Sequence, residues 1–199
     1  MKVESSTQLK ITVIGEYFVG KTSVIGRFVD GTFDDTYSAT IGFTFLSKKV
    51  KFNNKDYVLN IWDTSGSERH RAVAPNYYRG SDGCILVYDL SNPKSLEPLE
   101  YWLKEFRNLS SVAGFSESVP SILIGNKADL PFDPSTQSEA ESFAQKNGIE
   151  KHLITSALTG LNVDEAFQSL VEICSTHQIQ QFQQVSLSLS PPSKKKNCC

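Results

Sequence analysis

Residues 15–22 read Gly-Glu-Tyr-Phe-Val-Gly-Lys-Thr, a G-x-x-x-x-G-K-T pattern between a predicted strand and a predicted helix. Its two glycines let the backbone bend so that successive N–H groups point at one anion, and the following helix adds the positive end of its dipole. Lys21 brings a point charge, and the Thr22 hydroxyl is a suitable ligand for Mg²⁺. The pattern therefore predicts a binding site for the phosphate groups of a nucleotide. We expect contacts from the whole segment: Gly15, Glu16, Tyr17, Phe18, Val19, Gly20, Lys21, Thr22 and Ser23.

The segment Asp63-Thr64-Ser65-Gly66 follows another apolar run and offers a second contact to the same ligand. Asp63 can hold Mg²⁺ through water, and the N–H group of Gly66 can contact the terminal phosphate. Segments of the type D-x-x-G also occur in ordinary turns, so this segment alone leaves both interpretations open.

The segment Asn126-Lys127-Ala128-Asp129 predicts a preference for guanine. The Asp129 carboxylate can accept hydrogen bonds from both the N1–H and N2–H₂ groups of guanine, whereas adenine has no such pair of donors. The alternative is a polar loop after a strand. Thr155-Ser156-Ala157 also follows a strand and favours the guanine site, because a backbone N–H there can donate to guanine O6.

The spacing of apolar residues predicts an α/β fold in which strands and helices alternate. We expect strands at 9–14, 42–52, 56–63, 84–88, 121–125 and 152–154, and helices at 21–30, 95–110, 136–147 and 162 to about 178. Such alternation gives a mostly parallel sheet covered on both faces, whose ligands bind beyond the carboxyl ends of the strands. All four candidate segments directly follow predicted strands, so we expect them to meet at one edge of the sheet.

Local signals predict several element boundaries. Gly31 is expected to end the first helix, and Asn53-Asn54 to form a tight hairpin between the second and third strands. Ser95 is a candidate cap for the second helix, and Asn162, with Glu165 three residues later, predicts a capping box at the start of the last one.

Composition and charge argue against some functions. The 20 Lys and Arg residues nearly balance 22 Asp and Glu residues, which argues against binding to nucleic acid through charge. No apolar run approaches the roughly 18 residues of a membrane span. Cys84 and Cys174 lie in apolar segments, as small core residues of a protein in the reducing cytosol do. We expect a flexible N-terminus at 1–7, one domain at 8–178 and a flexible tail at 179–199.

In order and spacing, these segments resemble those of Ras-like small GTPases over about residues 8–178, and within that group the chain is similar to the Rab family. The Rab-like segments are Ile41-Gly42-Phe43-Thr44-Phe45, Ile61-Trp62-Asp63-Thr64, Tyr77-Tyr78-Arg79-Gly80, Val87-Tyr88-Asp89 and the final Cys198-Cys199. The resemblance implies a P-loop nucleotide-binding fold. Its six-stranded sheet would be mostly parallel, with the second strand antiparallel and helices on both faces. The implied ligands are GTP or GDP with Mg²⁺.

The resemblance also implies roles for individual residues. Thr22 and Thr40 would bind Mg²⁺ directly, and Asp63 through water. Hydrolysis of GTP would depend on Lys21, Thr40 and Gly66, with Ser67 at a degenerate water-positioning site. Besides the phosphate loop, the nucleotide contacts would be Phe33, Tyr37, Thr40, Asp63, Gly66, Asn126, Lys127, Asp129, Ser156, Ala157 and Leu158.

Residues 34–42 and 64–80 would be two switch loops, ordered by the γ-phosphate and released on hydrolysis. The surface presented to effectors would include Ile41, Phe45, Trp62 and Tyr77. The other implied partners are an exchange factor, a GTPase-activating protein and a dissociation inhibitor. We expect a monomer that does not bind nucleic acid.

The chain end resembles a doubly prenylated Rab terminus. Prenyl groups on Cys198 and Cys199 would anchor the chain, because stable anchoring takes two signals, and Lys194–Lys196 would add attraction to an anionic surface. The implied location is the cytoplasmic face of an intracellular membrane, in exchange with the cytosol. The alternative is an unmodified, disordered end.

Three residues depart from the Rab pattern. Ser67 stands where Rabs carry the glutamine that orients the attacking water, and it is too short to span the same gap, so we predict slow intrinsic hydrolysis. Tyr17 stands where the family carries a small or short polar residue. Its side chain could crowd the arginine that a GTPase-activating partner brings to the γ-phosphate. It could also cover the nucleotide as a partial lid, or point to solvent. Leu158 replaces the usual lysine, at little cost if the backbone contacts the base.

Three functions are therefore compared. The first is a GTP-switched, membrane-anchored regulator of vesicle traffic. The second is a P-loop kinase or ATPase acting on small molecules, which Asn126–Asp129 argues against. The third is a GTP-binding interaction scaffold that does not hydrolyse GTP, which Ser67 and Tyr17 keep open.

Overall fold

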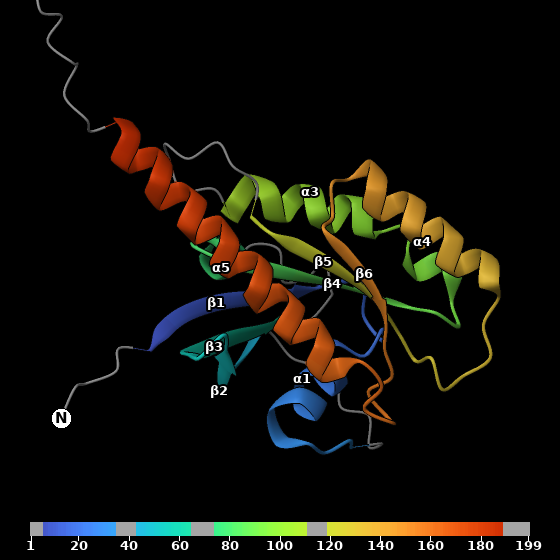
Figure 1. The fold of residues 1–199 in the computed structure, drawn as a ribbon. Helices are drawn as coiled ribbons and strands as arrows, with labels where there is room; N and C mark the ends of the chain where they lie inside the picture. The colour runs from blue at the N-terminus through green and yellow to red at the C-terminus, as the bar shows by residue number, and fades with distance from the viewer. Residues whose placement is uncertain (1–5, 35–42, 65–73, 111–118, 189–199) are drawn as a thin grey trace, which may run out of the picture.

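The computed structural model describes residues 6–34, 43–64, 74–110 and 119–188, and they form a six-stranded sheet with helices on both faces (Figure 1). The elements are β1 (Thr7–Ile14), α1 (Lys21–Asp30), β2 (Phe43–Phe52), β3 (Lys55–Thr64), α2 (Ala74–Tyr78), β4 (Gly83–Asp89), the 3₁₀ turn η2 (Pro93–Ser95), α3 (Leu99–Ser110), β5 (Ser121–Asn126), α4 (Pro134–Lys146), β6 (Lys151–Ile154) and α5 (Val163–Ser188). The strand order is β2-β3-β1-β4-β5-β6. Strand β2 is antiparallel to β3, and the other pairs are parallel, which confirms the predicted fold class.

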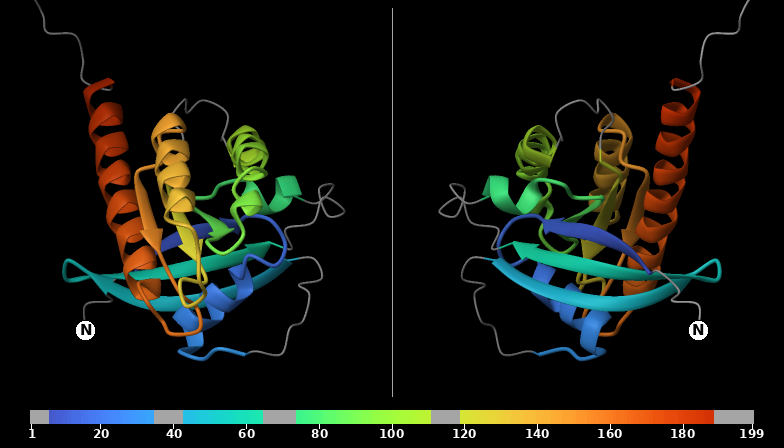
Figure 2. Two further views of the ribbon diagram at one scale, coloured as in Figure 1. Left: turned by 90° about the vertical axis from the view of Figure 1, so that its right-hand side faces the viewer. Right: turned by 90° about the vertical axis from the view of Figure 1, so that its left-hand side faces the viewer.

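Helices α1 and α5 cover one face of the sheet, and α2, α3 and α4 cover the other (Figure 2). On the first face, the rings of Phe28 in α1 and Phe167 in α5 are stacked with their centroids 3.8 Å apart. On the second, Tyr78 of α2 packs edge-on against Phe106 of α3. Strands β4 and β5 are buried along their whole length between these two cores, so their carboxyl ends are rigidly placed.

Two predicted turns are confirmed. Gly31 ends α1 in the left-handed conformation with φ 72°, and its N–H group donates to the Arg27 carbonyl at 3.1 Å. Asn53 and Asn54 both have positive φ angles, 47° and 59°, as a two-residue hairpin of type I′ requires.

The predicted start of the second helix is wrong. Helix α3 begins at Leu99, and residues Pro93–Ser95 form a separate 3₁₀ turn. The Ser95 hydroxyl donates to the Asn92 carbonyl at 2.7 Å and accepts from the Asp89 N–H group at 2.9 Å, so it closes the turn after β4 instead of capping a helix.

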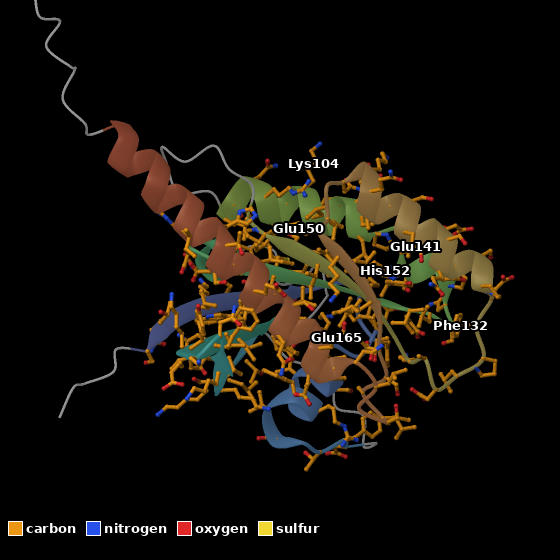
Figure 3. The ribbon with its side chains drawn as sticks, in the orientation of Figure 1. Lys104, Phe132, Glu141, Glu150, His152 and Glu165 are labelled. Carbon is orange, nitrogen blue, oxygen red and sulfur yellow. The ribbon has the colours of Figure 1, made fainter. Side chains whose placement is uncertain are left out.

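The last helix begins directly after Asn162, as predicted, but the capping box predicted there is absent. The Asn162 side-chain amide donates to the Ile154 carbonyl at 2.9 Å, which ties the start of α5 to the end of β6. Glu165, labelled on α5 in Figure 3, forms an ion pair with Lys151 of β6 at 3.1 Å. Helix α5 continues to Ser188, well beyond the predicted end near residue 178, so residues 179–188 are helical. Among the described residues, none of the helices has the length and apolar character needed to cross a membrane.

Candidate functional site

The segment Gly15–Thr22 joins β1 to α1 and lies tightly against β4 and β5. A Cβ atom on Gly15, whose φ is 147°, would lie 2.3 Å from the Val87 carbonyl oxygen. One on Gly20, whose φ is 91°, would lie 2.4 Å from Nδ2 of Asn126. Both glycines are therefore required for close packing as well as for the bend. Gly20 also precedes α1 without a side chain to cap its first turn, as an anion site at a helix N-terminus requires.

Lys21 is buried inside this loop, with 5% of the residue exposed. Its ammonium group donates to the carbonyl oxygens of Gly15 and Glu16 at 3.0 and 2.8 Å. Burial lowers the pKa of Lys21 to about 8, and the carboxylates of Asp63 and Glu16 oppose that shift. The loop thus holds the ammonium group at its own centre, where phosphate oxygens would meet it.

Thr22 and Asp63 supply two oxygen donors at one point of the site. The Thr22 hydroxyl donates to Oδ2 of Asp63 at 2.5 Å, and Asp63 is fully buried at the end of β3. Mg²⁺ prefers oxygen ligands and in phosphate sites takes one or two carboxylates, so this donor set fits Mg²⁺. Among the described residues there is no group of three or more His, Cys, Asp and Glu side chains that could hold a metal ion by themselves.

Asn126 connects the phosphate loop to the predicted base site. Its Nδ2 atom donates to the Val19 carbonyl at 3.0 Å, and its Oδ1 atom accepts from the Ala157 N–H group at 3.1 Å. The residue is 1% exposed. Asn126 therefore acts on the site by joining its two halves, a role that the sequence motif alone did not indicate.

Asp129 and the segment 155–158 lie together, as predicted for a base site. The Ser156 hydroxyl donates to Oδ1 of Asp129 at 2.5 Å. The N–H groups of Ser156 and Ala157 donate within the protein, to the Leu161 carbonyl and to Asn126. Contact of a backbone N–H group with guanine O6 stays a prediction. Leu158 is half exposed, in keeping with a backbone role at this position.

Arg27 supports the same segment from α1. Its Nε atom donates to the Ala157 carbonyl at 2.7 Å and its Nη2 atom to the Leu158 carbonyl at 2.6 Å. Lys127, in the predicted base site, is also held by a contact within the protein. Its Nζ atom forms an ion pair with Oδ2 of Asp89 at 2.7 Å. Sequence analysis assigned no role to Arg27 and named Asp89 only within the Rab-like segment Val87-Tyr88-Asp89, since a basic residue in a last helical turn and an acidic residue at a strand end are common in proteins.

Three aromatic residues predicted to contact the nucleotide differ in their exposure. Tyr17 and Phe18 are 56% and 55% exposed, and their rings contact one another with centroids 4.9 Å apart. Phe18 has a positive φ of 65°. Phe33 is half-buried and packs against the core under α1 and α5. Exposure of Tyr17 is compatible with each of its three predicted roles.

The predicted effector surface contains a continuous aromatic cluster. The rings of Phe45 and Trp62 have centroids 5.2 Å apart, and those of Trp62 and Tyr77 5.3 Å apart. The Lys10 ammonium group lies 5.1 Å from the centroid of the Trp62 ring and donates to the carbonyl of Arg79, the residue after α2. Phe45 is 52% exposed, so the cluster reaches the surface.

Some predicted site residues lie outside the described part of the chain. They are Tyr37, Thr40, Ile41, Gly66, Ser67, Cys198 and Cys199. The remaining predicted nucleotide residues lie at the carboxyl ends of strands, in the loops that follow them or in the first turn of α1, except for Phe33, which comes after α1. Asn126 joins the two main segments.

Comparison with known proteins gives matches over the same region. A model of the Ras family matches residues 10–176. Ras-related protein RABG3f of Arabidopsis thaliana is 40% identical over 169 residues, covering 83% of this chain and 82% of that protein. Ypt/Rab-type GTPase ypt7 of Schizosaccharomyces pombe is 40% identical over 167 residues, covering 83% and 81%. Ras-related protein Rab7 of Pisum sativum is 38% identical over 169 residues, covering 83% and 82%.

Proposed function

Because the chain belongs to the Rab family of Ras-like small GTPases, we propose that it regulates vesicle traffic by alternating between GTP and GDP states. Proteins of this family bind GTP and GDP with Mg²⁺ and hydrolyse GTP, so the chain is a GTPase. The observation that best supports the proposal is the link through Asn126, which brings the phosphate loop and the base segment into one site. The aromatic cluster of Phe45, Trp62 and Tyr77 also supports the proposal, because it could form the surface that partners contact in the GTP state.

Within this site we assign roles by chemistry. Lys21 and the N–H groups of Gly15–Thr22 bind the phosphates. Mg²⁺ would be held by Thr22 and Thr40 directly and by Asp63 through water. When bound, Mg²⁺ would neutralise negative charge on the phosphate oxygens. Asp129 accepts the two guanine donors, with the Ser156 hydroxyl keeping its carboxylate in place.

Identification of the bound nucleotide tests the proposal. Protein purified from cells without added nucleotide is denatured, and the released nucleotide is separated by anion-exchange chromatography. We expect guanine nucleotide at close to one per chain. Lys21→Ala is the control and should release little. ATP, or no nucleotide in the wild type, would support the kinase or ATPase alternative.

A slow intrinsic rate is the second part of the proposal, and it rests on Ser67. Single-turnover hydrolysis is followed in the wild type and in Ser67→Gln, with Tyr17→Gly as a separate variant. We expect Ser67→Gln to be faster, because glutamine can orient the attacking water. Equal rates would contradict this role of Ser67. GTP that is never hydrolysed, even with a Rab-activating protein, would support the scaffold alternative.

Membrane attachment is the third part. The proposed anchor is a prenyl group on each of Cys198 and Cys199, which would place the protein on the cytoplasmic face of an endomembrane. The proposed partners are effectors, an exchange factor, a GTPase-activating protein and a dissociation inhibitor. Intact mass measurement of protein from its native cell tests the anchor. An unmodified mass would contradict it.

A further inference from the structure

Lys127 has a backbone conformation that L-residues seldom adopt. Its φ angle is 67°, in the left-handed region. Hydrogen bonds on both sides hold the backbone there, since the Ala128 N–H group donates to the Thr155 carbonyl and the Leu130 N–H group to the Lys127 carbonyl, each at 3.0 Å. Such conformations persist where the surroundings fix them, and they concentrate at functional sites. The first atoms of the Lys127 side chain therefore leave the backbone in a fixed direction.

The far end of the same side chain is held by Asp89. The Nζ atom lies 2.7 Å from Oδ2 of Asp89, with 31% of the lysine side chain and 10% of the aspartate side chain exposed. Partial burial and close contact distinguish this ion pair from the exposed pairs of the protein, such as Lys146 with Glu100. Lys127 is thus fixed at both ends.

Contacts within the protein itself fix the position of the Asp89 carboxylate. Asp89 is the last residue of β4 and pairs with Asn126 in the register of β4 and β5. Its other oxygen, Oδ1, accepts hydrogen bonds from the N–H and hydroxyl groups of Ser91 at 2.9 and 2.7 Å. Two separate contacts therefore set the plane of the carboxylate, and only Oδ2 is directed to Lys127.

We propose that Asp89 is a positioning residue of the guanine nucleotide site, which holds the methylene stem of Lys127 as a preformed surface for the face of the base. The inference rests on the proposed function, in which Lys127 contacts the base. A free lysine side chain loses much rotamer entropy when it is ordered, and here folding has already ordered it. Nucleotide binding is tighter because this ordering does not have to occur on binding.

The rate at which fluorescently labelled GDP dissociates from the full chain, with Mg²⁺ present, tests the inference. Asp89→Asn keeps the contacts to Ser91 but removes the negative charge, and it should accelerate dissociation about five- to tenfold. Lys127→Met keeps an unbranched stem without the charge and should give a similar acceleration. Ser91→Ala is the matched control, because it leaves the ion pair intact, and it should change the rate less than about twofold.

A double-mutant cycle separates positioning from a general effect on the fold. In a Lys127→Ala background, Asp89→Asn should have almost no further effect on the dissociation rate. Asp89→Asn should also accelerate the dissociation of labelled inosine diphosphate (IDP) by the same factor. IDP lacks the 2-amino group of guanine, but the Lys127 stem contacts the face of the ring and not that group.

Four results would overturn the inference. The inference is wrong if Asp89→Asn and Lys127→Met leave the dissociation rate of GDP unchanged while Lys127→Ala accelerates it. Asp89→Asn could act equally in both backgrounds, which would make Asp89 a support of the fold. Ser91→Ala could match Asp89→Asn, which would assign the effect to the turn after β4. If Lys127→Ala itself has no effect, the proposed base site is wrong, and the inference falls with it.

Discussion

The side-chain amide of Asn126 donates to the carbonyl oxygen of Val19 at 3.0 Å, although 107 positions separate the two residues in the chain. The same side chain accepts from the N–H group of Ala157, so one buried residue joins the phosphate loop, the end of β5 and the segment after β6. The two ends of a bound nucleotide would therefore contact parts of the protein that cannot move independently.

Replacing Asn126 should weaken the fold as well as the binding of nucleotide. Asn126→Ala leaves the buried Val19 carbonyl and Ala157 N–H group without their partner, and each such group costs about 1–3 kcal/mol. We expect the free energy of unfolding in urea to fall by about 2 kcal/mol or more. Asn126→Asp keeps an acceptor for the Ala157 N–H group but loses the donor to the Val19 carbonyl. Its free energy of unfolding should lie between those of Asn126→Ala and the wild type. Equal stability of Asn126→Ala and wild type would show that the link is not structural.

Asp129 should decide which base is bound. Asp129→Asn replaces one acceptor oxygen by a donor, so it no longer matches the two guanine donors but can match the carbonyl of xanthine. We expect the affinity for GDP to fall about 100-fold and that for XDP to rise, measured by competition with labelled nucleotide. Ser156→Ala is the control, because it removes the hydroxyl that holds Asp129 and should weaken both bases alike. Unchanged preference in Asp129→Asn would contradict the proposed role.

Two glycines should respond to alanine in opposite directions. Gly15→Ala puts a Cβ atom 2.3 Å from the Val87 carbonyl at a φ of 147°, and should lower the free energy of unfolding by about 2 kcal/mol or more. Gly26 lies inside α1 with nothing within 4 Å of a Cβ atom, so Gly26→Ala should raise that free energy by about 0.5–1 kcal/mol. Thermal unfolding of both variants measures the difference. Destabilisation by Gly26→Ala would contradict the packing described here.

His152 should make stability depend on pH. Burial lowers the pKa of His152 below its ordinary value, with an opposing effect from Glu141 on α4, which runs beside β6 (Figure 3). The Nε2 atom is also 3.0 Å from the Tyr88 hydroxyl. Because the native state binds this proton less readily than the unfolded chain, the stabilising contribution is complete above a pH of about 6.5 and is lost as the pH falls through the native pKa.

The variant His152→Gln isolates that contribution, since glutamine can still hydrogen-bond to Tyr88 but does not titrate. Urea unfolding at several pH values between 7.5 and 5.5 should show a smaller loss of stability in the variant than in the wild type. Identical losses would mean that other groups cause the pH dependence in this range.

Local sequence patterns predicted most of the strands and turns, because these elements depend mainly on residues that are close together in the sequence. Apolar runs located the strands, and the glycines and the Asn53-Asn54 pair located the turns, since these residues tolerate positive φ angles whatever surrounds them. The last helix does begin after Asn162 as predicted, but the side-chain caps predicted for Ser95 and Asn162 were wrong for the same reason. Their side chains bond to Asp89, Asn92 and Ile154, and a capping pattern in the sequence cannot show such competing partners.

The sequence by itself determined the class of ligand, because the phosphate loop and Asp129 carry the chemistry of phosphate and guanine binding in contiguous segments. Tertiary structure decided how those segments are held. Asn126 joins two of them, Arg27 supports the base segment and Asp89 orients Lys127. These contacts cross between elements far apart in the chain, and their geometry depends on strand order and register, which local spacing does not specify.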